Sequence, residues 1–150
     1  MMPTDQTDDI NEITENFKML DDWEDRYRYL IELGSKLTRF GRVERTPENK
    51  VHGCVSQVWI AGRLEERDGA SVMVFSGDSD AHIVRGLMTI LFTACSQRRA
   101  EEILKTDIHS IFAKIGLDEH LTPQRGNGLT SMVERIRQDA RLVMRRDRAD

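Results

Sequence analysis

The segment VSQVWIAGRLEERDGASVMVFSGDSDAHIVRGLMTILFTACS, residues Val55–Ser96, contains two short apolar runs followed by a longer one. The first run, Val55–Leu64, has a strand-like pattern, and Asp68-Gly69 is a dipeptide that favours a tight hairpin turn. The run ASVMVFS after this turn predicts a second strand. The segment therefore predicts an antiparallel β-hairpin.

The third run of this segment, from about Asp80 to Ser96, predicts a helix. Its residues are apolar almost all round, which is typical of a helix buried at the centre of a domain. The sequence GDSD, residues 77–80, has the composition of a turn and a helix N-cap, which gives Asp80 a capping role. Cys95 lies on the apolar face, so we interpret it as a small core residue.

Two helices are expected before the hairpin. Apolar residues follow helical spacing over Ile10–Leu20, and residues before about Asp8 are expected to be disordered. Asp21-Asp22 can cap a second helix, DWEDRYRYLIELG, which Gly34 would end. Residues 36–50 contain glycine, proline and many charges, so they predict a loop. The buried face of the second helix is predicted to contain Trp23, Tyr27, Leu30 and Ile31.

Three more helices are expected after the central one, over Ala100–Leu104, Ile108–Ile115 and Gly128–Met144, with Gly116 ending the second of them. The final helix is predicted to bury Leu129, Met132, Val133, Ile136, Ala140 and Val143. No internal repeat or second domain is evident. The predicted fold class is α+β, with a small antiparallel β-sheet packed against several helices in a single domain over residues 1–150.

The composition is that of an ordinary globular protein, since 39% of the 150 residues are hydrophobic and 32% are charged. A net charge of −4 without a basic stripe argues against a nucleic-acid partner. The longest nearly uncharged apolar segment, GLMTILFTAC, is too short to span a membrane, and the acidic N-terminus does not resemble a signal peptide. We therefore expect a cytoplasmic protein whose two cysteines, Cys54 and Cys95, stay reduced.

Cys54 stands in KVHGCVSQVWI, residues Lys50–Ile60, where a polar loop becomes the first strand. Gly53 can adopt a positive φ there, which would leave the thiol approachable from one side. On position alone, a cysteine that merely begins a strand is the slightly favoured interpretation. His52 either lowers the pKa of Cys54 or, in the favoured interpretation, is a solvated loop histidine.

Metal and phosphate sites are not indicated by the motifs of the chain. A metal site needs about four ligands at suitable spacing, which two widely separated cysteines do not provide. The segment GDSDAHIVRG has no lysine where a phosphate-binding loop requires one. We interpret the carboxylates of DDWED as helix capping and a solvated face.

Four segments of the chain resemble the SufE family of sulfur-acceptor proteins, in the order and with the spacing of that family. DWEDRYRYLIELG is similar to the family's N-terminal helix, and GCVSQVW to the segment that holds its sulfur-accepting cysteine. GDSDAHIVRGL resembles the start of its central helix, and LTPQRGNGL resembles its C-terminal loop. The resemblance implies the SufE/NifU-like fold, which is shared with scaffold proteins of iron–sulfur cluster assembly.

The resemblance also implies a chemical role for Cys54. This residue would accept a sulfane sulfur from a pyridoxal-phosphate-dependent cysteine desulfurase of the SufS or CsdA kind and would stimulate that enzyme. The Cys54 persulfide would then pass its sulfur to an iron–sulfur cluster scaffold of the SufBCD kind. The protein would be a carrier rather than an independent multi-turnover enzyme, and no cofactor or metal is expected in it because a ligand set is missing.

Other positions around the cysteine match the family less strongly. The residues expected to support the loop or to bind the partner are Gly53, Val55, Ser56, Gln57, Asp80 and Arg125. Asp80 matches an aspartate beside the cysteine loop, although capping the central helix is an equally good role. Arg125 matches the arginine of an LTPxR motif, where it could stabilise a thiolate, pair with an acidic group of the desulfurase or form an ordinary surface salt bridge.

Two alternatives stay open. A cluster scaffold needs about three or four ligands, usually cysteines, and only one thiol of this chain is predicted to be exposed. A thiol-dependent hydrolase needs Cys54 paired with a histidine, and only His52 is close in sequence. Nothing in the sequence marks a third orienting residue or an oxyanion hole for that chemistry.

Overall fold

The computed structural model of the chain describes residues 6–149, and it contains the predicted hairpin. β1 (Val58–Arg67) pairs antiparallel with β2 (Ala70–Ser79) along the full length of both strands. Asp68 and Gly69 form the turn with φ angles of 53° and 80°, as a two-residue turn with two positive φ angles requires. The hairpin prediction is confirmed, but β1 begins at Val58 because residues 55–57 belong to the preceding loop.

The predicted central helix is α3 (His82–Cys95), and all of residues 86–95 are buried, as expected. The prediction that residues 77–80 form a turn and cap this helix is wrong. β2 continues through Ser79, and Ala81 occupies the N-cap position of α3 without a side-chain hydrogen bond. The carboxylate of Asp80 is therefore not used for capping, and it makes a different contact that is described below.

The two predicted N-terminal helices are α1 (Gln6–Met19) and α2 (Trp23–Ser35). Residues 6–8 are helical, although the sequence predicts disorder before about Asp8; residues 1–5 lie outside the described part of the chain. The predicted cap of α2 is confirmed, because the Asp22 carboxylate accepts a hydrogen bond of 3.0 Å from the backbone N–H of Glu24.

Gly34 does not end α2, contrary to the prediction, but allows α2 and α3 to approach closely. A Cβ atom on Gly34 would lie 3.0 Å from the backbone nitrogen of Gly86, and a Cβ atom on Gly86 would clash with the carbonyl group of Leu30. This close crossing buries Leu33 and Gly34 at the interface. Ile31, predicted to be buried, is instead 44% exposed.

The remaining helices differ from the prediction mainly at the C-terminus. They are η1 (Leu37–Phe40, a 3-10 helix), α4 (Ala100–Lys105), α5 (Ile108–Lys114), α6 (Leu117–His120) and α7 (Pro123–Ala149). α4 and α5 are the predicted short helices, whereas η1 and α6 were not expected. α7 begins at Pro123 rather than Gly128, so most of LTPQRGNGL is helical and is not a loop. Proline fits the first position of a helix because its missing N–H needs no partner there.

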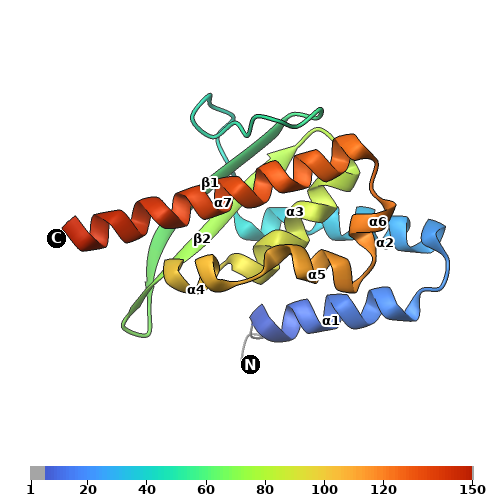
Figure 1. Ribbon diagram of the computed structural model, residues 1–150, viewed down its shortest axis with the longest axis horizontal. Coiled ribbons are helices and arrows are strands. Elements are labelled where there is room, and N and C mark those ends of the chain that lie inside the picture. The colour runs from blue at the N-terminus through green and yellow to red at the C-terminus, as the bar shows by residue number, and fades with distance from the viewer. Residues whose placement is uncertain (1–5, 150) are drawn as a thin grey trace.

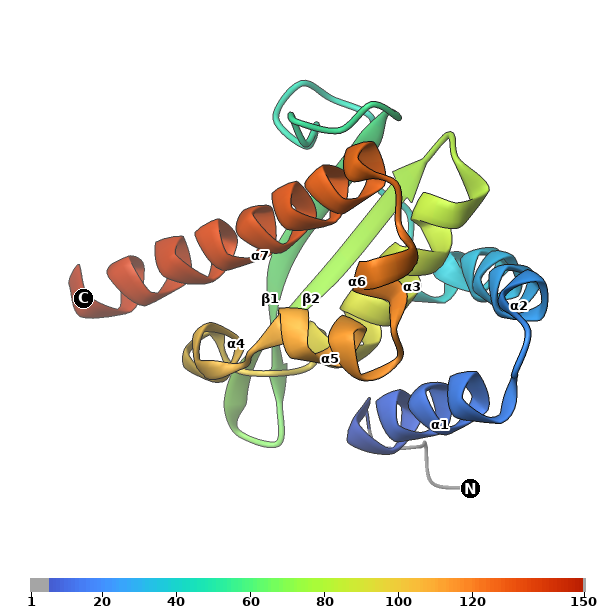
Figure 2. The ribbon, with the colours of Figure 1, turned by 45° about the vertical axis from the view of Figure 1, so that its right-hand side comes forward.

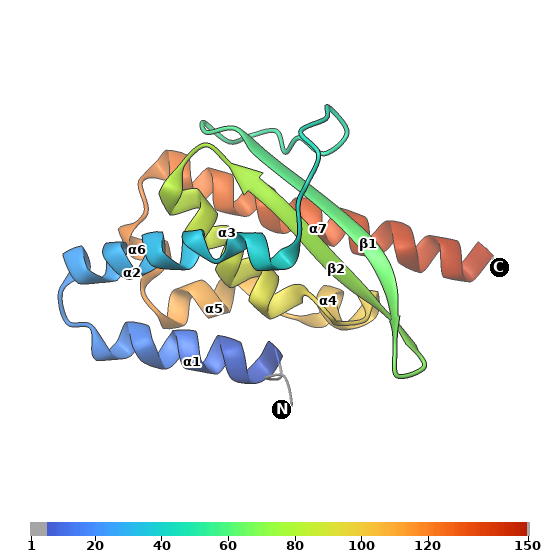
Figure 3. The ribbon, with the colours of Figure 1, turned by 180° about the vertical axis from the view of Figure 1, so that it is seen from behind.

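The helices cover the hairpin and each other around α3, as Figures 1 and 3 show from opposite sides. α3 contacts β2, α1 and α2, while α7 contacts α4 and crosses β1. The loop between η1 and β1 lies near the N-terminal end of α7 in Figure 2. The largest side chains of the core include Phe17, Leu30, Phe75, Phe92 and Phe112.

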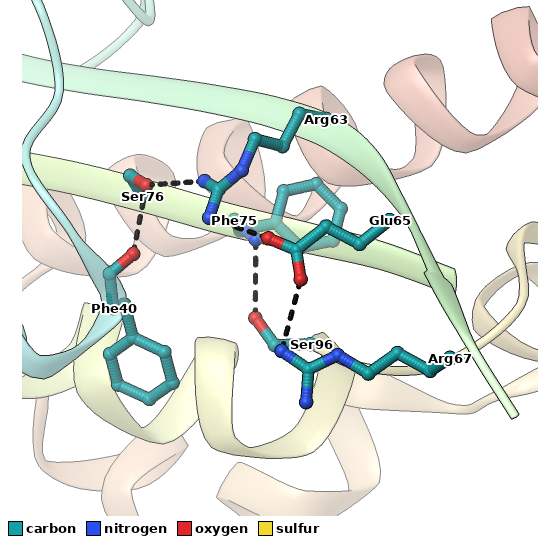
Figure 4. Close-up of polar contacts among 7 residues, drawn as sticks. All are labelled: Phe40, Arg63, Glu65, Arg67, Phe75, Ser76 and Ser96. Atoms are coloured by element: carbon teal, nitrogen blue, oxygen red, sulfur yellow. Dashed lines mark hydrogen bonds and ion pairs between the residues drawn. The ribbon is translucent and has the colours of Figure 1, made fainter. Parts of the chain in front are cut away.

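Polar contacts fix the middle of the hairpin to its neighbours (Figure 4). The hydroxyl of Ser76 donates a hydrogen bond of 2.9 Å to the carbonyl of Phe40 in η1, and the N–H of Phe75 donates to the hydroxyl of Ser96 at 3.2 Å. The Arg63 guanidinium donates to Ser76 and also pairs with Glu65 at 2.9 Å. β2 is thus attached to the segments before β1 and after α3, which gives a rigid support for the start of β1.

Candidate functional site

The segment around Cys54 is a short loop whose two ends are hydrogen-bonded to each other. Val51 N–H donates to the carbonyl of Val58 at 2.9 Å, and Ile60 N–H donates to the carbonyl of Asn49 at 2.8 Å. Residues 52–57 lie between these pairs and form neither helix nor strand. We name residues 52–57 the cysteine loop, and its base is thus an extension of β1.

Gly53 turns the chain inside the cysteine loop with a φ of +92°, which confirms the predicted positive φ. A Cβ atom at this position would also clash with the hydroxyl oxygen of Ser131 in α7. Glycine is therefore needed for two reasons, the backbone conformation and the close approach of the loop to α7.

Cys54 follows this turn, and its side chain is half-buried against the first turns of α7. The Cys54 Sγ lies 3.7 Å from the carbonyl oxygen of Gly128, at the distance of a weak S–H hydrogen bond. A cavity of about 280 Å³ opens beside the thiol. The residues around this cavity, which we name the thiol cavity, are Cys54, Val55, Ser56, Val58, Val84, Leu87, Thr122, Gln124, Arg125, Gly128, Leu129 and Met132.

The thiol cavity is bordered by apolar residues of α3 and of the later turns of α7, and by polar residues at the start of α7. Val84 and Leu87 of α3 and Met132 of α7 are buried hydrophobic residues. Thr122 and Arg125 are exposed polar residues at the opposite side. A thiol at this boundary is partly shielded from water, and one side of the cavity stays open to an approaching partner.

Burial raises the pKa of the Cys54 thiol, with loss of solvation as the cause. The thiol in this position is consequently protonated at neutral pH, which makes it a poor nucleophile while the loop is closed. His52 is exposed and is not among the residues of the thiol cavity, which fits the interpretation as a solvated loop histidine.

Asp80 holds the C-terminal end of the cysteine loop. Its carboxylate accepts a hydrogen bond of 3.1 Å from the backbone N–H of Gln57, and its own N–H lies 3.4 Å from the carbonyl oxygen of Gln57. This contact replaces the predicted capping role and brings Asp80 to the loop. The sequence alone could suggest the proximity but not the atom that Asp80 binds.

The other loop residues that the sequence analysis selected have different surroundings. Val55 is 80% exposed, which is unusual for a large apolar side chain. Ser56 is half-buried at the edge of the thiol cavity, and Gln57 is exposed and held through its backbone. Arg125 borders the thiol cavity from the first turn of α7 and has no ion-pair partner among residues 10–117 and 119–146, whose side chains the structure describes.

The part of α7 that lies behind the cysteine loop was not predicted from the sequence. Ser131 contacts Gly53, and Arg135 donates hydrogen bonds to backbone carbonyls before the loop. Pro123 preceded by Thr122 was the available indication that α7 starts early enough to bring these residues to the loop. Polar residues on the same helix face as Gly128 then follow from the helical period.

Two further features are absent from the described part of the chain. No cluster of three or more histidine, cysteine, aspartate or glutamate side chains could hold a metal ion within this part of the chain. No helix in the same residues is both long and apolar enough to cross a membrane.

Comparison with known proteins identifies relatives over nearly the whole chain. The family described as "SufE: Fe-S metabolism associated domain" matches residues 11–140. An uncharacterized SufE-like protein of Rhizobium etli is 52% identical over 133 residues, which cover 89% of this chain and 90% of the relative. An uncharacterized SufE-like protein of Rhizobium meliloti is 50% identical over 131 residues, which cover 87% of this chain and 94% of the relative.

A solved structure has a similar fold. The solution structure of a hypothetical protein from Thermus thermophilus superposes with a TM-score of 0.63 and 22% sequence identity. The similarity covers 90% of this chain and 95% of that protein, so it extends over most of the elements described above. This similarity supports the α+β fold class.

Proposed function

The chain belongs to the SufE family, whose domain is associated with Fe–S metabolism, and we propose that it accepts sulfur from a cysteine desulfurase as a persulfide on Cys54. It then delivers this sulfur to an iron–sulfur cluster assembly scaffold. The observation that carries the proposal is the position of Cys54, at the tip of a short loop beside a partly open cavity. Cys95, in contrast, is 1% exposed in α3 and has no access to a partner.

The sulfur transfer is a displacement between two cysteines and needs no oxidant. The Cys54 thiolate attacks the terminal sulfur of the cysteine persulfide on the desulfurase. The S–S bond of the donor breaks, the donor cysteine leaves as a thiolate, and a new S–S bond forms on Cys54. One sulfur atom and one proton move with the terminal S–H group, so atoms and charge balance across the step.

The closed cysteine loop protects the thiol rather than activating it. Burial raises the pKa of the Cys54 thiol, and its Sγ faces the carbonyl oxygen of Gly128, which is too weak a base to take the thiol proton. Movement of the loop into the interface with the desulfurase would restore solvation or bring the thiol to a cationic group, and either change favours the thiolate. A protonated and partly buried thiol is also less susceptible to oxidation between transfers.

The surface around the thiol cavity suits a protein partner. The exposed Val55 side chain lies next to Cys54 and offers apolar area that a partner can bury. Arg125, at the border of the thiol cavity, offers an exposed guanidinium for a carboxylate of the desulfurase. Since specific recognition usually buries about 800 Å² on each partner, the contact must extend well beyond Cys54 itself.

Mass spectrometry after incubation with a cysteine desulfurase and cysteine tests this function. We expect a mass increase of one sulfur atom on the peptide that contains Cys54 and none on the peptide that contains Cys95. In a desulfurase turnover assay, Cys54→Ser is expected to abolish the stimulation of sulfide release, because a hydroxyl cannot form a persulfide. In calorimetry the same variant is expected still to bind the desulfurase. Cys95→Ala serves as the matched thiol control and retains stimulation.

Three outcomes would contradict the proposal. Full stimulation by Cys54→Ser would identify the protein as an allosteric activator of the desulfurase that accepts no sulfur. A persulfide found on Cys95 in the folded protein would show that α3 opens during the reaction. An iron–sulfur absorbance band that stays with the protein after anaerobic reconstitution and gel filtration would favour the alternative of a cluster scaffold.

A further inference from the structure

Arg135 of α7 binds the backbone on the N-terminal side of the cysteine loop. Its Nη2 donates a hydrogen bond of 3.0 Å to the carbonyl oxygen of Glu48, and its Nη1 makes a longer contact of 3.5 Å with the carbonyl oxygen of Lys50. Lys50 forms an isolated bridge with Trp59 of β1, and Glu48 lies in the turn that directly precedes it. One guanidinium thus attaches this segment to α7 by two parallel contacts.

Asp139 holds the Arg135 side chain in this orientation. Arg135 Nε lies 3.3 Å and 3.4 Å from the two carboxylate oxygens of Asp139, one helical turn further along α7. Both side chains are largely buried, with 19% and 17% exposed. Asp139 also lies against β1 at Gly62, where a Cβ atom would come within 3.3 Å of its Oδ2. An ion pair this enclosed has a more fixed geometry than an exposed pair.

Close packing holds part of the loop base, since Val51 is a core residue that is 5% exposed. A polar depression of about 370 Å³ lies between the loop base and α7, next to the Arg135 contacts. Its residues are Lys50, Val51, His52, Ser131, Glu134, Arg135 and Gln138. Beside this space the Arg135 guanidinium is a polar connection that joins Glu48 and Lys50 to α7.

The two ends of the cysteine loop are therefore held by side chains from different elements. Arg135 holds Glu48 and Lys50 on the N-terminal side, and Asp80 holds Gln57 on the C-terminal side. Between these points Val51 is buried and hydrogen-bonded to Val58, and after it come the weak Cys54 Sγ contact and the proximity of Gly53 to Ser131. The segment that is free to move is therefore residues 52–56.

We propose that Arg135, oriented by Asp139, is a positioning residue for Cys54 that fixes the N-terminal side of the cysteine loop on α7. This inference rests on the sulfur-acceptor function proposed above. The fixed base limits the opening of the loop to residues 52–56, so the thiol leaves and returns to the same place beside the thiol cavity. Loss of the contact lets the base lift from α7 and leaves Cys54 exposed for a larger fraction of the time.

Alkylation of the native full-length protein over a range of pH tests this role. In Arg135→Gln we expect Cys54 to react about tenfold faster, the factor that loss of one charge-assisted hydrogen bond allows. The pH midpoint of the Cys54 reaction is also expected to fall, because a solvated thiol loses the burial that raises its pKa. A variant that is only less stable overall would not shift the pH midpoint of the Cys54 reaction and leave Cys95 unreactive at the same time.

Arg141→Gln is the matched control, since Arg141 forms an exposed ion pair of 2.9 Å with Glu134 on the same helix and does not contact the loop. It is expected to leave both the rate and the midpoint unchanged. Asp139→Asn, which keeps the shape of the side chain and removes its charge, is expected to give an intermediate rate. An unchanged Cys54 rate in both Arg135→Gln and Asp139→Asn would overturn the proposal.

Amide hydrogen exchange of the wild-type protein gives an answer that does not depend on any variant folding. Val51 lies in the hydrogen-bonded base of the cysteine loop, so its amide is expected to exchange slowly. The amides of residues 53–56 are expected to exchange fast. Equal exchange at Val51 and at residues 53–56 would overturn the proposal. Neither measurement uses a desulfurase, so failure of sulfur acceptance and failure of this positioning role are distinguished.

Discussion

Cys54 and Cys95 carry the same thiol in two parts of the molecule that differ in how the chain holds them. Cys95 lies in a helix whose neighbours are buried for three turns, and burial raises the pKa of its thiol to about 12. Cys54 lies in a six-residue loop held at its ends, and burial raises its pKa as well. The direction of the pKa shift therefore does not separate a reactive cysteine from a structural one. The cost of exposing each thiol does, because a loop opens locally and a buried helix does not.

The largest expected effect is a difference in alkylation rate between the two thiols. In the native protein at neutral pH, Cys54 is expected to react with iodoacetamide at least about 100-fold faster than Cys95, which must wait for opening of α3. Peptide mass spectrometry of samples quenched over time measures both rates in one reaction, and unfolding in urea provides the equal-rate reference. Similar native rates would show that α3 opens as readily as the cysteine loop.

The next effect is a loss of stability at high pH that depends on Cys95. Its pKa rises from 9.0 in the unfolded chain to about 12 in the folded protein, so the folded state retains a proton that the unfolded state releases. This contribution is complete below pH 9 and is lost as the pH rises toward 12. Between pH 9 and pH 11, the free energy of unfolding should fall about 2 kcal/mol further in the wild type than in Cys95→Ala.

Urea unfolding of both proteins at several pH values measures this difference. Cys54→Ala is the matched control, and because its thiol is only half-buried we expect a pH dependence close to that of the wild type. Parallel curves for the wild type and Cys95→Ala would contradict the burial assigned to Cys95.

The smallest expected effect concerns Asp80, which holds the C-terminal side of the cysteine loop. Asp80→Ala removes the 3.1 Å hydrogen bond to Gln57 N–H, and we expect Cys54 to alkylate about threefold faster, since exposed hydrogen bonds contribute little. The free energy of unfolding should change by less than about 0.5 kcal/mol, because α3 loses no cap. Glu101→Ala, at an exposed residue of α4, is the control. A decrease of about 1 kcal/mol in the free energy of unfolding of Asp80→Ala would instead indicate that Asp80 caps α3.

Features of this fold that depend on residues close in sequence were predicted correctly, and features that depend on distant residues were not. The hairpin turn at Asp68-Gly69 and the Asp22 cap of α2 depend on residues within a few positions, so their sequence patterns predicted them correctly. Gly34 was misread because a glycine near a helix end also fits a close helix crossing, and only the partner at Gly86 distinguishes the two. The capping role of Asp80 was wrong for a similar reason, since a turn-like sequence can also continue a strand, whereas its expected place beside the cysteine loop agrees with the structure.

The candidate site shows the same division. The sequence led to the proposal of Cys54 as the sulfur acceptor, through its resemblance to a known motif, and it predicted the positive φ of Gly53. Arg125 was placed near the site correctly, although as part of a loop rather than of α7. Arg135 and Asp139 were missed because they stand in an ordinary helical pattern and their charges look like those of a solvated face.

By itself, the sequence determined most of the elements and the buried central helix, because periodicity and turn chemistry are properties of neighbouring residues. Only the tertiary structure decided that Cys54 rests half-buried beside Gly128, that Asp80 and Arg135 hold opposite ends of its loop, and that Cys95 has no path to a partner. These features join residues far apart in the chain. Their free energies depend on distance and burial, which are set only when α3, α7 and β1 pack together.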